Sequence, residues 1–247
     1  EIKDPAATRL REGDSVLACL AGSTRAPVVF FSNFGTAYTT RMTDIPATTG
    51  YGEPIQKLFK LKDSETIVAA LVLDPRVVGD LQDHPEHYPE TFALFVADDG
   101  YAATFGLSSF AEPSTRAGRR FAKLAEGATV LHVSAVHGHE TVIAATRQRH
   151  ALLCELSELN YLAGPGRGVI LIKLADKDDR VLGARAVLDD RETLVLKTSI
   201  GGEQRINTAK YELTARGGRG REIIKRGTFT EVVSEPVAAP VLPEQAS

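Results

Sequence analysis

The feature that most constrains the fold of this chain is a sequence unit of about fifty residues that recurs along it. Each unit contains an apolar strand, a tight polar turn, a returning strand, a short helix-like turn, and a loop rich in glycine and arginine that leads into another strand. The loop glycines Gly52, Gly118, Gly168 and Gly220 are separated by 66, 50 and 52 residues, and a polar insertion at residues 80–89 explains the longer first spacing. A fixed period in this range is typical of solenoids and bladed arrays.

The four units predict an all-β architecture. The dipeptides Asp99-Gly100 and Gly201-Gly202 reach positive φ at little cost, which is typical of a two-residue turn between two apolar strands. The chain also has many β-branched runs, 21 glycines, 12 prolines and no tryptophan. We therefore expect a propeller-like array of about four to five blades with repeats of about 50 residues, each blade burying its apolar face against the next. Hydroxyl side chains that are expected to cap the helix-like turns occur at Thr43, Ser108 and Ser157.

The repeats span most of the chain, so we expect one domain over residues 1–233, with its first blade truncated at the N-terminus. The chain begins with Glu1 and its only methionine is Met42, so we interpret it as a piece of a longer polypeptide. Residues 234–247 are rich in proline and alanine, contain acids and no bases, and lack periodicity. We expect this tail to be disordered.

Charge is unevenly distributed along the chain. The overall net charge is −3, but residues 1–113 hold 9 basic and 16 acidic side chains, whereas residues 114–226 hold 20 basic and 13 acidic ones. A positive segment between acidic ones can bind phosphates locally while the whole chain stays soluble.

Several weaker signals are interpreted as structural. The pairs His84 and His87, and His137 and His139, have spacings that a metal could use, but they lack cysteine partners and a helical face, so we expect no metal site. The sequence Gly-Pro-Gly-Arg-Gly at residues 164–168 precedes a strand rather than a helix, which argues against a dinucleotide-binding loop.

The two cysteines, Cys19 and Cys154, are too few for a disulfide framework and fit a reducing cytosol. Both lie in apolar strands and are expected to be small buried hydrophobic side chains. No apolar run approaches the roughly 18 residues of a membrane helix, so we expect no membrane partner.

Three stretches of the first unit carry a resemblance to a known family: Phe-Phe-Ser-Asn-Phe-Gly-Thr-Ala-Tyr at 30–38, Ile-Pro at 45–46 and Tyr-Gly-Glu-Pro-Ile at 51–55. They resemble the repeat of the C-terminal domain of type IIA bacterial topoisomerase A subunits, a family that includes DNA gyrase and topoisomerase IV. The opening at residues 4–14 and the closing at 216–226 are more similar to the topoisomerase IV version. The resemblance extends over about residues 4–233.

This resemblance implies a β-pinwheel, a propeller-like disc in which neighbouring blades exchange strands, and a role in binding and bending double-stranded DNA along a basic outer edge. It also implies partners, namely the rest of the A subunit together with the ATPase B subunit of a heterotetramer in the bacterial cytoplasm, associated with the nucleoid. The family's catalytic tyrosine motif is absent here, so this fragment alone is not expected to be an enzyme. Any ATP and Mg²⁺ are expected on other domains of the holoenzyme, with no cofactor on this fragment.

A glycine-rich loop flanked by arginines lets the backbone approach a phosphate, while guanidinium groups grip its oxygens. The first unit offers only Lys57 and Lys60, so we expect a basic edge that is strongest in the last three units. The predicted DNA-binding residues are Arg116, Arg119, Arg120, Lys123, Arg167, Arg216, Arg219, Arg221, Lys225 and Arg226.

One departure from the family bears on activity. Gyrase A subunits carry the box Gln-Arg-Arg-Gly-Gly-Lys-Gly in an early blade, and the nearest match here is Thr-Ala-Arg-Gly-Gly-Arg-Gly at 214–220, in the last unit. Its absence near the start favours relaxation and decatenation over supercoiling. The alternatives are a bladed scaffold for protein interactions that binds no nucleic acid and, ranked lower, a propeller enzyme.

Overall fold

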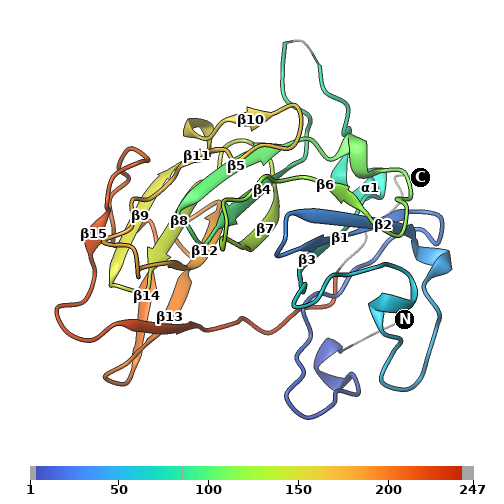
Figure 1. Ribbon diagram of the computed structural model, residues 1–247, viewed down its shortest axis with the longest axis horizontal. Coiled ribbons are helices and arrows are strands. Elements are labelled where there is room, and N and C mark those ends of the chain that lie inside the picture. The colour runs from blue at the N-terminus through green and yellow to red at the C-terminus, as the bar shows by residue number, and fades with distance from the viewer. Residues whose placement is uncertain (1–3, 85, 241–247) are drawn as a thin grey trace.

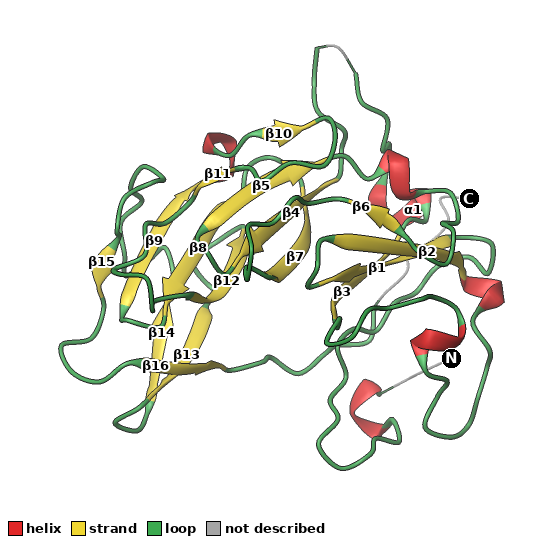
Figure 2. Cartoon of the chain, viewed as in Figure 1, coloured by secondary structure: helices red, strands yellow, loops and turns green. Residues whose placement is uncertain are grey.

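The structure is a computed structural model that describes residues 4–84 and 86–240. Its strands form four separate, mainly antiparallel sheets, which we call blades 1 to 4 (Figure 1). Each blade is built on one sequence unit. Loops and short 3-10 turns connect them (Figure 2). The chain is therefore a bladed all-β domain, as the repeats predict.

Blade 1 consists of β1 (Pro27–Ser32), β2 (Thr36–Arg41), β3 (Ile67–Val72) and β6 (Arg119–Arg120), in the order β3-β1-β2-β6. Blade 2 consists of β4 (Phe92–Ala97), β5 (Tyr101–Phe105), β7 (Val130–Val136) and β10 (Tyr161–Leu162), in the order β10-β5-β4-β7, and β11 (Val169–Ile170) also pairs with β5.

Blade 3 consists of β8 (Thr141–Thr146), β9 (His150–Glu155), β12 (Val181–Val187) and β15 (Arg221–Glu222), in the order β12-β8-β9-β15. Blade 4 has three strands, β13 (Leu194–Thr198), β14 (Glu203–Ile206) and β16 (Phe229–Val232), in the order β14-β13-β16.

Neighbouring units exchange strands. The second unit donates β6 to the hairpin of blade 1, where Arg119 lies opposite Ala37. The third unit donates β11 to blade 2, and the fourth donates β15 to blade 3. Each donated strand pairs with the second strand of the receiving hairpin, so a blade is complete only when the following unit is present.

The order of strands within each sheet defines an inner and an outer end. The strands β3, β7, β12 and β16 contact one another in succession and thus lie at the inner ends. The donated strands β6, β11 and β15 lie on the other side of each hairpin, away from these inner strands. The outer strands therefore form the rim of the blade array.

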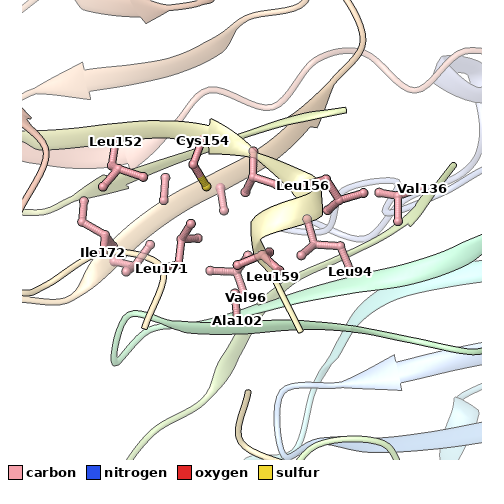
Figure 3. Close-up of a cluster of buried hydrophobic side chains, with 14 of the residues drawn as sticks. Leu94, Val96, Ala102, Val136, Leu152, Cys154, Leu156, Leu159, Leu171 and Ile172 are labelled. Carbon is pink, nitrogen blue, oxygen red and sulfur yellow. The ribbon is translucent and has the colours of Figure 1, made fainter. Parts of the chain in front are cut away.

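Three apolar clusters hold adjacent blades together. Between blades 1 and 2, the donated Phe121 packs edge-on against Phe31 and stacks on Phe105, each at a centroid distance of 5.2 Å. Figure 3 shows the cluster between blades 2 and 3, where Leu171 and Ile172, which follow β11, are fully buried. Burying such a side chain stabilises the fold by on the order of 1.5–3 kcal/mol. The exchanged segments therefore also contribute apolar side chains to the core.

The two cysteines differ in their surroundings. Cys154 on β9 is buried in the second of these clusters (Figure 3), as the sequence predicts, and burial raises the pKa of its thiol to about 12. Cys19 is only half-buried and lies in the N-terminal segment, outside the described strands.

The helix-like turns are real, but the predicted caps are wrong. The 3-10 turns η2 (Met42–Asp44), η4 (Ser108–Phe110) and η5 (Leu156–Glu158) follow the hairpins of blades 1, 2 and 3. The hydroxyl side chains that were expected to cap them lie inside the turns instead. None of these turns has a side-chain hydrogen bond at its N-cap. Two further 3-10 turns, η1 (Pro5–Ala7) and η3 (Ile55–Lys57), and the short helix α1 (Pro75–Val78) complete the described helical elements.

One inner-strand histidine makes the stability of the fold depend on pH. Burial, and then the Arg185 guanidinium, lowers the pKa of His132 on β7 to about 4, below the ordinary value of about 6.5. Its Nε2 lies 3.0 Å from Ser134 Oγ. The folded state therefore resists protonation, and the stability gained from the neutral ring is lost as pH falls from about 6.5 towards 4.

Between pH 7 and pH 5, we expect the free energy of unfolding to fall by about 1–2 kcal/mol more for the native protein than for a His132→Gln variant. Denaturant unfolding at the two pH values measures the difference. His139→Gln, in an exposed loop, is the control and should follow the native protein. An equal pH response of the native protein and the His132→Gln variant would contradict the assignment.

Candidate nucleic-acid interface

Strand exchange moves the basic loops to the rim. Arg119 and Arg120 form β6 at the outer end of blade 1, and Arg221 begins β15 at the outer end of blade 3. Arg167 lies two residues before β11 on blade 2. Three successive outer strands thus carry or adjoin arginines, which a basic edge requires.

The expected distribution along this edge needs a correction. The sequence places the clusters in the last three units, but each donated strand belongs to the blade before its own unit. Blade 1, expected to be weak, receives Arg119 and Arg120. Blade 4 receives no donated strand from the residues that the structure describes.

Two of the loop glycines, Gly168 and Gly220, are needed for the strand exchange, a role additional to the phosphate approach that the sequence predicts for these loops. Gly168 has a φ of +79°, and a Cβ there would lie 2.2 Å from the carbonyl oxygen of Ala102. Gly220 has a φ of +73°, and its Cβ would meet Ala151 O at the same distance. No other residue fits against a neighbouring backbone at such a distance.

Three of the predicted DNA-binding arginines brace loops within the domain. The Arg119 guanidinium donates to Ser109 O at 2.5 Å and also to the carbonyls of Glu112 and Pro113. Arg216 donates from Nε to Glu158 O at 2.7 Å. Arg116 donates weakly to the carbonyls of Gln56 and Lys57, at 3.4 and 3.5 Å. Their donors are thus at least partly used by protein groups.

Two further arginines are paired with carboxylates. Arg167 Nη2 lies 3.1 Å from Asp99 Oδ2, and its guanidinium stacks 3.7 Å above the Tyr101 ring. Arg221 Nη2 lies 2.5 Å from Glu212 Oε2. These pairs are exposed, so each contributes at most about 1 kcal/mol. A phosphate can replace such a partner at little cost.

The remaining predicted cations are exposed at the rim. Within residues 4–84 and 86–240, the side chains of Arg120, Lys123, Arg219, Lys225 and Arg226 make no hydrogen bond or ion pair. Arg219 acts only at longer range. The pKa of the Asp176 carboxyl is held below its usual range mainly by a hydrogen bond from Gln148 and by local backbone donors, and the charge of Arg219 adds a smaller contribution. These five cations keep their donors available for an anion.

The structure adds a basic hollow on blade 1 that sequence analysis did not find. Lys60, Lys62 and Arg120 line an open hollow of about 590 Å³ beside β2. Two of its lining residues, Tyr38 and Lys62, are held by the buried Glu65, whose carboxylate accepts a hydrogen bond from Tyr38 Oη at 2.9 Å and from the backbone N–H of Lys62 at 2.8 Å. Burial, and then this carboxylate, raises the pKa of Tyr38.

From the sequence, Lys60 is only a neighbour of the first loop, and nothing distinguishes Lys62. Both lysines lie between the first marker glycine and β3, where the repeat pattern gives no signal. Only the folded chain brings them beside Arg120, which comes from the next unit.

One histidine of each pair lies against a carboxylate. His84 Nε2 lies 2.8 Å from Asp80 Oδ2, and His137 Nδ1 lies 3.1 Å from Glu140 Oε1. No group of three or more potential metal-binding side chains occurs in the described part of the chain. Likewise, no helix among the described residues is long and apolar enough to cross a membrane.

Comparison with protein families gives a match to the model described as "DNA gyrase C-terminal domain, beta-propeller". The match covers residues 26–74, 92–137 and 162–187, which fall in blades 1, 2 and 3. The repeats that define this chain are therefore similar to those of the family.

Among curated relatives, the DNA gyrase A subunit of Aminobacterium colombiense is 29% identical over 214 residues, covering 86% of this chain and 24% of the relative. The DNA topoisomerase 4 A subunit of Salmonella typhimurium is 28% identical over 224 residues, covering 89% of this chain and 27% of the relative. The chain thus spans about a quarter of the length of these relatives.

Two solved structures share the fold. The C-terminal domain of DNA topoisomerase IV superposes with a TM-score of 0.79 at 18% identity, over 93% of this chain and 69% of that chain. The E. coli ParC C-terminal domain gives a TM-score of 0.73 at 20% identity, over 94% and 90% of the two chains.

Proposed function

This chain belongs to the family of C-terminal domains of DNA gyrase and topoisomerase IV A subunits, and on that premise we propose that it binds double-stranded DNA without sequence specificity along the rim of its blades and bends it. The observation that carries the proposal is the set of exposed rim cations on successive blades that have no partner among the described residues. Lysine and arginine contacts to phosphates fix the position of a duplex without reading its bases.

Bending follows from the geometry of the rim. A duplex that contacts blade 1 and blade 3 must follow the curve along which the sheets are arranged (Figure 1). Bending 20–30 base pairs by 40–90° costs on the order of 1–6 kcal/mol, which a few phosphate contacts offset. The paired cations Arg167 and Arg221 would exchange their carboxylate partners for phosphates.

We further propose that the domain serves an ATP-dependent strand-passage enzyme, a DNA topoisomerase (an isomerase). In this proposal the partners are the rest of the A subunit together with the ATPase B subunit of a cytoplasmic, nucleoid-associated heterotetramer. ATP and Mg²⁺ would act on those other parts. Because the glutamine-initiated box is absent from the early blades, decatenation and relaxation are the proposed reactions, with supercoiling less favoured.

Duplex binding across a salt series tests the proposal. If the five exposed rim cations each neutralise one phosphate, the logarithm of the association constant should fall with the logarithm of salt concentration at a slope near −4.5, since each contact contributes about −0.9. Fluorescence anisotropy with a labelled 30-base-pair duplex between about 50 and 300 mM salt measures this slope. No binding at low salt, or a flat response, would support the protein scaffold instead.

A further inference from the structure

Blade 1 lies at one end of the blade array (Figure 1), and the basic hollow is on its end face. Successive side chains of a strand point to opposite faces of its sheet. On β2, Ala37 faces blade 2 and is fully buried in the apolar cluster between the two blades. Its neighbours Thr36 and Tyr38, which line the hollow, therefore point to the opposite face. In the described part of the chain, no further blade covers that face.

The charged groups that line the hollow are three cations and one carboxylate. Lys60, Lys62 and Arg120 line it together with Asp63, and all four residues are exposed. Within residues 4–84 and 86–240, the side chains of the three cations make no hydrogen bond or ion pair. Because the cations outnumber the carboxylate, the hollow attracts an anion.

The backbone that carries the two lysines is ordered by specific hydrogen bonds. The backbone N–H of Lys60 donates to Arg116 O, in the loop that leads to the donated strand, at 2.7 Å. The backbone N–H of Lys62 donates to the Glu65 carboxylate, which also accepts the hydroxyl of the buried Tyr38. A site whose backbone is fixed before binding loses less conformational entropy when a ligand arrives.

We propose that the basic hollow binds a phosphate group of duplex DNA beyond the rim, so that the duplex turns from the outer strands onto the end face of blade 1. Lys60 and Lys62 hold the phosphate from one wall of the hollow, and Arg120 holds it from the other. This inference rests on the proposed DNA binding. It adds two binding lysines that belong to none of the outer strands.

Duplex DNA is the occupant because the hollow is continuous with the rim. Arg120 lies on the donated strand β6 at the outer end of blade 1 and also lines the hollow, so one side chain joins the two surfaces. The open volume of about 590 Å³ exceeds that of a phosphate group and leaves room for the sugars on either side. Lysine contacts of this kind fix the position of a duplex without reading its bases.

Two substitutions in the hollow should change affinity in opposite directions. Lys60→Ala/Lys62→Ala is expected to bind the labelled duplex roughly eightfold more weakly at about 0.1 M salt, with a salt slope shallower by about 0.9, because one phosphate contact is lost. Asp63→Asn should bind about two- to fivefold more tightly, because it removes a like charge beside the phosphate. Anisotropy titrations measure both effects, and circular dichroism and thermal melting confirm that each variant is folded.

The matched control is Lys57→Ala/Lys197→Ala. It removes the same charge from two exposed lysines that pair with Glu53 and Glu231 and do not line the hollow. Its affinity should stay within about threefold of the native chain, since long-range attraction is largely screened at this salt. Lys60→Arg/Lys62→Arg keeps both charges in the hollow and should also bind like the native chain.

A cross-link locates the contact directly. Ala117 lines the hollow and is exposed, so Ala117→Cys can carry a benzophenone maleimide. The background is Cys19→Ser, because Cys19 is only half-buried, whereas Cys154 is buried and takes no label. Ultraviolet light should join the labelled Ala117→Cys variant to the duplex. Ala238→Cys, at an exposed position after blade 4, should give no cross-link.

Native affinity in Lys60→Ala/Lys62→Ala, an equal loss in the lysine control, or the lack of a cross-link from Ala117→Cys would each overturn the inference. The rim proposal would stand in all three cases, because the native chain would still bind the duplex with its salt-dependent affinity. If the native chain does not bind the duplex at low salt, the proposed function itself is wrong and this inference fails with it.

Discussion

Gly168→Ala is expected to destabilise the domain by about 2 kcal/mol more than Gly52→Ala. Both glycines have nearly the same positive φ, +79° and +81°, so both substitutions incur the cost of a left-handed alanine, roughly 1–2 kcal/mol. Only at Gly168 does the new Cβ meet a neighbouring backbone, the carbonyl of Ala102 at 2.2 Å, whereas nothing lies within 4 Å at Gly52. Relieving such a contact typically costs a further 1–3 kcal/mol.

Thermal melting of the two variants makes the comparison direct. The cost of the left-handed backbone is the same in both and cancels, so the difference in Tm measures the contact of the new Cβ with the Ala102 carbonyl. For a domain of this size, the expected difference corresponds to about 4–8 °C in Tm. A matching drop in the two variants would mean that the glycines are needed only for their positive φ, and that the exchanged strand tolerates displacement from the hairpin.

The double variant Lys225→Ala/Arg226→Ala is expected to reduce the affinity for duplex DNA by roughly 50-fold at about 0.1 M salt, and to make the salt slope shallower by about 1.8. Both side chains are exposed and have no partner in the part of the chain described by the structure, so their loss should leave the fold unchanged. Anisotropy titrations at several salt concentrations give affinity and slope together.

The matched control is Arg9→Ala/Arg191→Ala, which removes the same charge from two exposed positions away from the outer strands. Its affinity should stay within about threefold of the native chain, since long-range attraction is largely screened at this salt. An equal loss of affinity in both double variants would show that binding depends only on net charge and would contradict a localised binding edge.

The hairpins were predictable from the sequence because their signals are local. Asp99-Gly100 and Gly201-Gly202 lie at the hairpin turns, and the units at residues 92–121 and 141–169 start at or next to the strands observed. The resemblance also supplied strand exchange as a property of the family. Periodicity and turn chemistry act over a few residues, so they are visible in a single sequence.

The destination of each donated strand was not predictable. The pairs Arg119–Arg120 and Val169–Ile170 are only two residues long, and their partners lie about 70–80 residues earlier in the chain. No local pattern fixes such a pairing. For the same reason the sequence assigned Arg119 and Arg120 to the second blade rather than the first, and it gave no sign that Gly168 and Gly220 approach a neighbouring backbone.

The sequence also did not predict which arginines use their donors within the domain. Arg119 and Arg219 each lie beside a marker glycine, Arg119 directly after Gly118 and Arg219 directly before Gly220. Arg119 donates to three carbonyls of its own unit, whereas Arg219 remains exposed without a partner among the described residues. The difference depends on where the preceding turn places its carbonyl groups. Sequence spacing identifies a recurrent cation, and only the folded loops decide which donors stay available.

The donated strands also have a consequence for synthesis on the ribosome. The hairpin of blade 3 is translated by Glu155, but the strand that completes its sheet, β15, begins only at Arg221. At a translation rate of about 5–20 residues per second, each nascent sheet keeps an unpaired edge for several seconds. Such an edge can pair with another chain, so slowing elongation should favour aggregation of this domain more than of a propeller whose blades close within one repeat.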